Sequence, residues 1–188
     1  MFIDEYWMTR TGRELCEHYS DKIEEWWDPE KFLWEDDSWA LAKYCYDFFD
    51  VWWDPDLFDW SSSWALAEFC SDQFDEWWDA EKFCWGFADH LAIYCPDHFD
   101  EWWDPKKFPK KYFSQLAISC PDHFKTWWDE KRWDWDIDKY NEEDDINVIK
   151  CLKDNCGVYF TNLQLKQLFF HQNKKARQFA AEILKSRR

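Results

Sequence analysis

The stretch LAIYCPDHFDEWWDPKKF, from Leu91 to Phe108, contains the pattern that decides the fold. Its paired tryptophans with a following aspartate occur five times, and the first tryptophans of successive pairs are 26, 25, 25 and 25 residues apart. The pairs are Trp26-Trp27, Trp52-Trp53, Trp77-Trp78, Trp102-Trp103 and Trp127-Trp128. A fixed period of roughly 20–50 residues is typical of solenoids. The sequence therefore predicts five tandem units, each stacked on its neighbours.

Each unit is predicted to contain two or three short helices. The first is typified by SWALAKYC, in which Ser38 is placed as the N-cap and Leu41, Ala42 and Cys45 share one helical face. Pro96 follows Cys95 directly, and proline ends one helix but suits the first turn of the next. The pattern predicts two successive helices joined at the cysteine.

The second helix is predicted to carry the paired tryptophans and to begin with an acidic first turn, which the helix dipole favours. The aspartates at that position are Asp21, Asp47, Asp72, Asp97 and Asp122. Asp54-Pro55 and Asp104-Pro105 predict an N-cap and first position for a third short helix. Helices this short are expected to be partly 3₁₀.

We therefore predict an all-α solenoid of five units of about 25 residues, built from short α and 3₁₀ helices. Residues 1–14 form an N-terminal lead-in or cap, residues 15–138 form the repeats, and residues 139–188 form an acidic connector and a helical C-terminal cap. In the cap, Thr161 with Gln164 predicts a capping box, and a last helix is predicted from about Lys174 to Lys185.

Charge divides the chain unevenly. Residues 1–138 hold 34 acidic and 13 basic residues, a net charge of −21, whereas residues 139–188 have a net charge of +4. All 18 tryptophans lie in the first part. A ladder of aromatics can stack nucleic-acid bases, but such proteins also need a basic groove. We therefore expect no direct nucleic-acid binding by the repeats.

Four cysteines recur at one position of the units, as Cys45, Cys70, Cys95 and Cys120. Packed helices lie ~8–10 Å apart, whereas a disulfide needs Cα atoms within ~7 Å. The sequence predicts free, buried thiols, as is usual in a reducing compartment.

Two C-x-x-H pairs, Cys95 with His98 and Cys120 with His123, are the strongest candidates for metal ligands. A closed zinc site needs all four ligands ~2.0–2.3 Å from the ion, which a repeat step of ~8–10 Å prevents. No phosphate-binding loop or hydrolase motif is present, and the recurrent aspartates are explained by capping. We predict no metal, no cofactor, no catalytic residue and no enzyme activity.

The units resemble the Trp-rich CPxxFDxWWDPxKFxW tandem repeats of bacteriophage and large-virus proteins over about residues 15–138. More loosely, the small residue and proline of Cys95-Pro96 and Cys120-Pro121 are similar to the break in leucine-rich-repeat variant solenoids. The first resemblance implies a bacteriophage accessory or counter-defence role with a host protein as partner. Neither resemblance implies a catalytic residue.

Adjacent residues of a helix point about 100° apart, so one tryptophan of each pair is expected in the core and the other at a surface. Burial of both rings remains the alternative. The candidate binding residues are Trp52, Trp77, Trp102, Trp127, Asp75, Asp100 and Glu101.

The function predicted from these features is protein–protein interaction, with a partner that has a basic surface. The alternative is nucleic-acid mimicry, in which rows of carboxylates occupy a DNA- or RNA-binding protein. The chain has no apolar run of about 18 residues and no basic-then-apolar N-terminus, so we expect no membrane contact and a cytoplasmic location, in the host if the protein is viral. The sequence gives no indication of oligomeric state.

Overall fold

The computed structural model describes residues 3–133, 135 and 148–187. All the secondary structure in these ranges is helical, which confirms the predicted all-α fold. The chain forms two compact units, Met1–Trp102 and Trp103–Arg188, here called the N-terminal and C-terminal units. The division falls between the two tryptophans of the fourth pair.

In the labels below, α marks α-helices and η marks 3₁₀ helices. The N-terminal unit contains α1 (Ile3–Trp7), α2 (Gly12–Tyr19), η1 (Ser20–Lys22), α3 (Ile23–Trp26), α4 (Trp34–Tyr44), η2 (Tyr46–Phe48), α5 (Phe49–Trp52), η3 (Trp60–Ser62), α6 (Ser63–Phe69), η4 (Ser71–Gln73), α7 (Phe74–Trp77), η5 (Trp85–Phe87), α8 (Ala88–Tyr94), η6 (Pro96–His98) and α9 (Phe99–Trp102). The C-terminal unit contains η7 (Lys110–Tyr112), α10 (Phe113–Ser119), η8 (Pro121–His123), α11 (Phe124–Trp127), α12 (Val148–Cys156), η10 (Gly157–Tyr159), α13 (Asn162–Phe169) and α14 (Lys174–Ser186).

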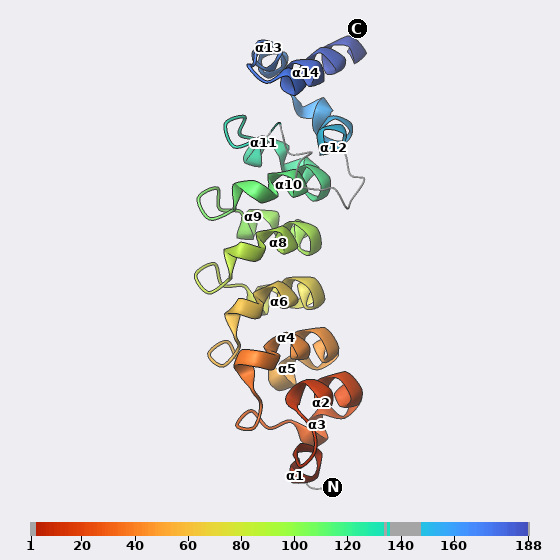
Figure 1. Cartoon of the computed structure of the whole chain (residues 1–188), viewed down its shortest axis with the longest axis vertical. Coiled ribbons are helices and arrows are strands. Elements are labelled where there is room, and N and C mark those ends of the chain that lie inside the picture. The colour runs from red at the N-terminus through yellow and green to blue at the C-terminus, as the bar shows by residue number, and fades with distance from the viewer. Residues whose placement is uncertain (1–2, 134, 136–147, 188) are drawn as a thin grey trace. The chain divides into compact units, whose positions relative to one another are not determined.

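In the N-terminal unit, α2, α4, α6 and α8 stack on one another in chain order (Figure 1). Each presents a fully buried leucine next to a fully buried small residue: Cys16 follows Leu15 in α2, Ala92 follows Leu91 in α8, and alanines flank the leucine in α4 and α6. Small side chains let successive helices approach closely. The Cys95 thiol, for example, donates to the carbonyl of Ala67 in the preceding repeat over 3.6 Å. All eight cysteines are free, which confirms the predicted thiols.

In the second to fifth repeats the first helix ends at the recurrent cysteine, where a 3₁₀ turn begins. Pro96 opens η6, as predicted. Cys70 has nearly the same backbone conformation as Cys95 although serine follows it (φ −120°, ψ 32° against φ −122°, ψ 41°). The break therefore does not depend on proline.

Ser38 is not an N-cap, contrary to the prediction. Helix α4 already begins at Trp34, and Ser38 is buried within it. The Ser38 hydroxyl donates to the Trp34 carbonyl over 2.5 Å and accepts from the Asp59 amide of the next repeat over 3.1 Å. Ser63 accepts from the Cys84 amide in the same way, over 3.0 Å. These buried serines join consecutive repeats.

The predicted third helix is instead a tight turn. In the second repeat the Asp54 side chain accepts from the Asp56 amide over 2.9 Å, and the Asp54 carbonyl accepts from the Phe58 amide over 2.9 Å. The aspartate therefore acts as the cap that was predicted, but the turn ends at the phenylalanine, which is buried.

The predicted acidic connector lies outside the described residues, and residues 148–187 contain a further partial repeat that sequence reasoning missed. Leu152, Cys156 and Phe160 are buried and have the spacing of Leu116, Cys120 and Phe124. Helix α12 packs on α10, and the Cys156 thiol lies 3.8 Å from the Ala117 carbonyl, as repeat cysteines do. Helices α13 and α14 then pack against each other. The predicted capping box at Thr161 is present, and α14 matches the predicted last helix.

Candidate interaction surface

The first tryptophan of each pair is in the core. Trp26, Trp52, Trp77, Trp102 and Trp127 are all at most 1% exposed. The prediction that Trp52, Trp77, Trp102 and Trp127 are binding residues at the surface is therefore wrong, because a partner cannot reach these buried rings in the folded chain.

A backbone carbonyl explains the position of the buried tryptophan. At the helix break the carbonyl of the recurrent cysteine accepts a 3₁₀ hydrogen bond from the amide three residues later, and the indole N–H seven residues later donates to the same oxygen. The distance is 2.9 Å for Trp52 to Cys45, 2.7 Å for Trp77 to Cys70 and 2.8 Å for Trp102 to Cys95. A buried indole N–H needs such an acceptor, and a carbonyl oxygen with two lone pairs can accept from both the amide and the indole.

The second tryptophan of each pair is only half-buried. Trp78 stacks on Phe74, with ring centroids 5.2 Å apart and an interplanar angle of 19°, and meets the edge of Trp85 at 6.0 Å. The helix ends at Trp77, and Trp78 has an extended backbone (ψ 121°), which turns its side chain toward the surface. Trp53 makes the same contacts with Phe49 and Trp60.

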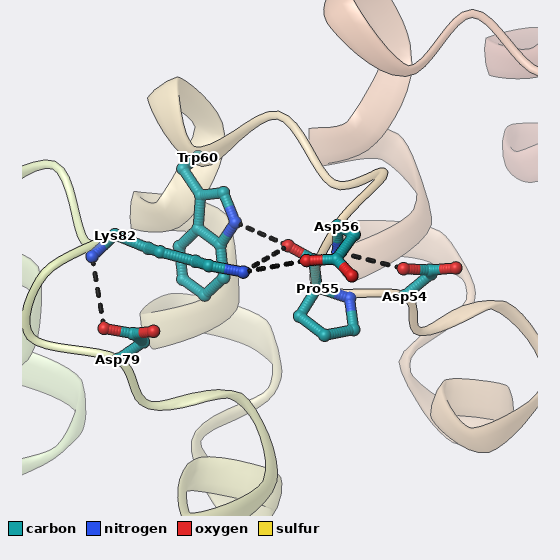
Figure 2. A network of polar contacts seen from close by, with 6 residues as sticks. All are labelled: Asp54, Pro55, Asp56, Trp60, Asp79 and Lys82. Carbon is teal, nitrogen blue, oxygen red and sulfur yellow. Dashed lines mark hydrogen bonds and ion pairs between the residues drawn. The ribbon is translucent and has the colours of Figure 1, made fainter.

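At this surface, Lys82 links its own turn to the Asp54–Phe58 turn of the preceding repeat (Figure 2). The Lys82 ammonium donates to the Pro55 carbonyl over 3.1 Å and to Asp56 over 3.2 Å, and it lies 5.6 Å from the centre of the Trp60 ring. The Trp60 indole donates to the same Pro55 carbonyl over 3.0 Å. In the C-terminal unit, Arg132 contacts the Pro105 and Phe108 carbonyls in the corresponding way. These contacts hold one turn against the next.

The second helical segments of the repeats carry the exposed acids. In the N-terminal unit these form the acidic rows, defined as Asp47, Asp50, Asp72, Asp75, Glu76, Asp97, Asp100 and Glu101, and every member is exposed. The predicted binding residues Asp75, Asp100 and Glu101 belong to this set. They do not share a surface with Trp52, Trp77 and Trp102, whose rings point into the core.

Sequence reasoning missed a second surface, on the outer side of the first helices. Trp39 in α4 and Trp64 in α6 are half-buried, and Trp64 lies 5.8 Å from the ring of His90 in α8. The signal was present, because Trp64 lies about 200° around a helix from Leu66 and so faces away from the core.

The shifted pKa values of the buried cysteines and of Asp37 have local structural causes. Burial raises the pKa of the Cys70, Cys95 and Cys120 thiols to about 12, so they remain protonated and unreactive. Burial also raises the pKa of Asp37, while the hydrogen bond from the Arg13 amide partly offsets this. Cys95 and His98 do not form a ligand pair, because the thiol faces Ala67 and the imidazole faces carboxylates.

Comparison with protein-family models, curated proteins and solved structures found no match. Among the described residues, none of the helices has the length and apolar character needed to cross a membrane.

Proposed function

We propose that this chain is a non-catalytic interaction scaffold whose acidic rows bind a basic surface of another protein. The observation that carries the proposal is the register of these rows. Asp50, Asp75 and Asp100 occupy one position of successive repeats, and all three are exposed. Stacked repeats place such carboxylates at a regular interval, ~8–10 Å for packed helices.

Burial of the first tryptophans favours an interface dominated by charge. Complementary charge steers association and sets specificity more than it adds affinity. The net charge of −21 over residues 1–138 attracts cationic surfaces and repels nucleic acid. The half-buried second tryptophans and the separate Trp39–Trp64 surface can add apolar contacts with a partner.

Nucleic-acid mimicry is the second candidate, and the regular carboxylates favour it. In this case the partner is a DNA- or RNA-binding protein, and the carboxylates occupy the positions of phosphates. The resemblance to Trp-rich bacteriophage repeats supports an accessory or counter-defence role inside a host cell, where a reducing cytoplasm suits eight free cysteines.

The test begins with affinity capture from lysate and identification of the partner by mass spectrometry. The purified partner is then titrated against two charge variants at two salt concentrations. The array variant combines Asp75→Asn, Asp100→Asn and Glu101→Gln, and we expect it to bind more weakly and associate more slowly. The tail variant neutralises Lys174, Lys175 and Arg177.

The tail variant is the matched control, and its affinity should remain within about threefold because scattered surface charges contribute little. Loss of binding by the tail variant alone would reverse the assignment of the binding surface. Competition by DNA, with steep salt dependence, distinguishes the mimic from a binder of other basic proteins.

A further inference from the structure

Three side chains from two consecutive repeats converge at one point of the acidic rows. Asp75 lies in α7, His98 in η6 and Glu101 in α9, and one potential donor atom from each lies within 4.8 Å of the others. The His98 Nδ1 atom is 2.9 Å from Glu101 Oε1 and 3.9 Å from Asp75 Oδ1. All three belong to the N-terminal unit.

The imidazole is held in place by an aromatic ring of the preceding repeat. His98 stacks on Phe74, with ring centroids 4.2 Å apart and an interplanar angle of 18°. Phe74 is itself buried at 1% exposure, so it provides a fixed platform. The stack presents the Nδ1 edge of His98 to both carboxylates without further ordering of the ring.

Among the described residues of the N-terminal unit, this arrangement of a histidine and two carboxylates occurs at one junction between repeats. Gln73 occupies the His98 position one repeat earlier, between Asp50 and Glu76, and Phe48 occupies it two repeats earlier. The carboxylates thus recur at the preceding junction, whereas the ring nitrogen does not. The recurrent acids have capping and solubility roles in every repeat, but these roles do not require histidine.

We propose that Asp75, His98 and Glu101 form a binding site for one first-row divalent transition-metal ion, ligated by His98 Nδ1 and one oxygen from each carboxylate. Imidazole combined with carboxylates suits zinc, cobalt or manganese, whereas calcium and magnesium prefer oxygen ligands alone. Bonds of ~2.0–2.2 Å to a shared ion are typical of these donors.

Small rotations of the two exposed carboxylates can achieve this geometry. The side chains of Asp75 and Glu101 are 82% and 51% exposed, so both rotate freely, and the open side of the site is accessible to water ligands. The surrounding acids raise the local concentration of cations. Neighbouring Cys95 cannot join the site, because it is buried and directed toward Ala67.

A bound ion would connect the third repeat to the fourth and neutralise part of the acidic rows. Metal binding and a basic partner would then compete for Asp75 and Glu101. The inference does not depend on the proposed function, because the ion is tested on the purified chain alone.

The experiment is calorimetric titration of the full chain with Co²⁺, together with the visible absorption spectrum of the bound ion. We expect one ion per chain and a spectrum of nitrogen and oxygen ligation. His98→Gln should weaken binding at least about 30-fold, and Asp75→Asn or Glu101→Gln about 10-fold, comparable to the losses when metal sites are perturbed.

Glu76→Gln is the matched control, since it removes the equivalent carboxylate at the preceding junction, and its affinity should stay within about twofold. If Glu76→Gln and His98→Gln weaken Co²⁺ binding equally, the ion is attracted diffusely to the acidic rows, and the proposed site is wrong. A thiolate charge-transfer band would assign the ion to cysteine instead. Absence of binding at millimolar Co²⁺ would leave His98 as an ordinary ion-pair partner of the two carboxylates. Circular dichroism without metal confirms that each variant is folded.

Discussion

Replacement of Trp77 by alanine tests the division of each tryptophan pair into a core ring and a half-buried ring. Trp77 is 1% exposed, and its indole N–H donates to the Cys70 carbonyl over 2.7 Å. Truncation of a buried tryptophan costs about 3–5 kcal/mol. Loss of the indole hydrogen bond adds about 0.5–1.5 kcal/mol, because the Cys70 carbonyl keeps its bond from the Gln73 amide. Because the two contributions overlap, we expect the free energy of unfolding to fall by about 4–6 kcal/mol.

Two further variants separate these contributions. Trp78→Ala removes a half-buried ring that stacks on Phe74, and we expect about half the cost of a core truncation, about 1.5–2.5 kcal/mol. Trp77→Phe keeps an aromatic ring in the core but removes the indole hydrogen bond, so the Cys70 carbonyl keeps only its bond from the Gln73 amide. We expect the lost hydrogen bond and the smaller ring to cost about 1–3 kcal/mol together.

The assay is equilibrium unfolding in urea followed by far-UV circular dichroism, since the backbone signal is independent of the tryptophan removed. Midpoints are compared at a common slope, because a changed slope indicates altered cooperativity. If Trp77→Ala is so destabilised that no folded baseline remains, Trp77→Phe still gives a measurable midpoint. A larger loss for Trp78→Ala than for Trp77→Ala would refute the assignment of core and surface rings.

Three further predictions concern single groups. Burial raises the pKa of the Cys70 thiol to about 12, so we expect Cys70 to react with iodoacetamide under native conditions far more slowly than the half-buried Cys84. Comparable alkylation rates, measured by peptide mass spectrometry, would contradict this expectation. Lys82→Met removes two hydrogen bonds of the exposed ammonium and its contact with Trp60, so we expect the free energy of unfolding to fall by about 0.5–1 kcal/mol and the thermal midpoint to fall slightly. An unchanged thermal midpoint would show that this contact between turns contributes nothing to stability. The pKa of Asp37 is raised in the folded chain, so the ionised carboxylate destabilises the folded state above that pKa. Asp37→Asn should therefore increase the free energy of unfolding at neutral pH. Urea midpoints measured at several pH values should show this gain shrinking as the pH falls through the folded-state pKa.

The candidate metal site lay beyond sequence reasoning for a geometric reason. Asp75 and His98 are 23 residues apart, so their distance depends on how α7 packs beside η6. The C-x-x-H spacing indicated Cys95 as the metal-ligand partner of His98. The helix ends at that cysteine, however, and the break sends the thiol inward and the imidazole outward.

The missed partial repeat of the cap was, in contrast, visible in the sequence. Leu152, Cys156 and Phe160 keep the repeat spacing, but no tryptophan pair follows them. A repeat prediction based on tryptophan pairs therefore does not include α12, although α12 keeps the other repeat positions.

The sequence by itself determined the class of fold, because a 25-residue period, helical spacing of Leu, Ala and Cys, and capping aspartates are all local or periodic signals. It also determined that the recurrent thiols stay apart, since the repeat step exceeds disulfide reach. Only the tertiary structure decided which tryptophan of each pair is buried. A four-residue helix presents both rings within reach of the core, and the outcome depends on the residue at which the backbone leaves the helix. Packing of α7 against its neighbours ends the helix at Trp77, which pairs its indole with the Cys70 carbonyl and turns Trp78 to the surface.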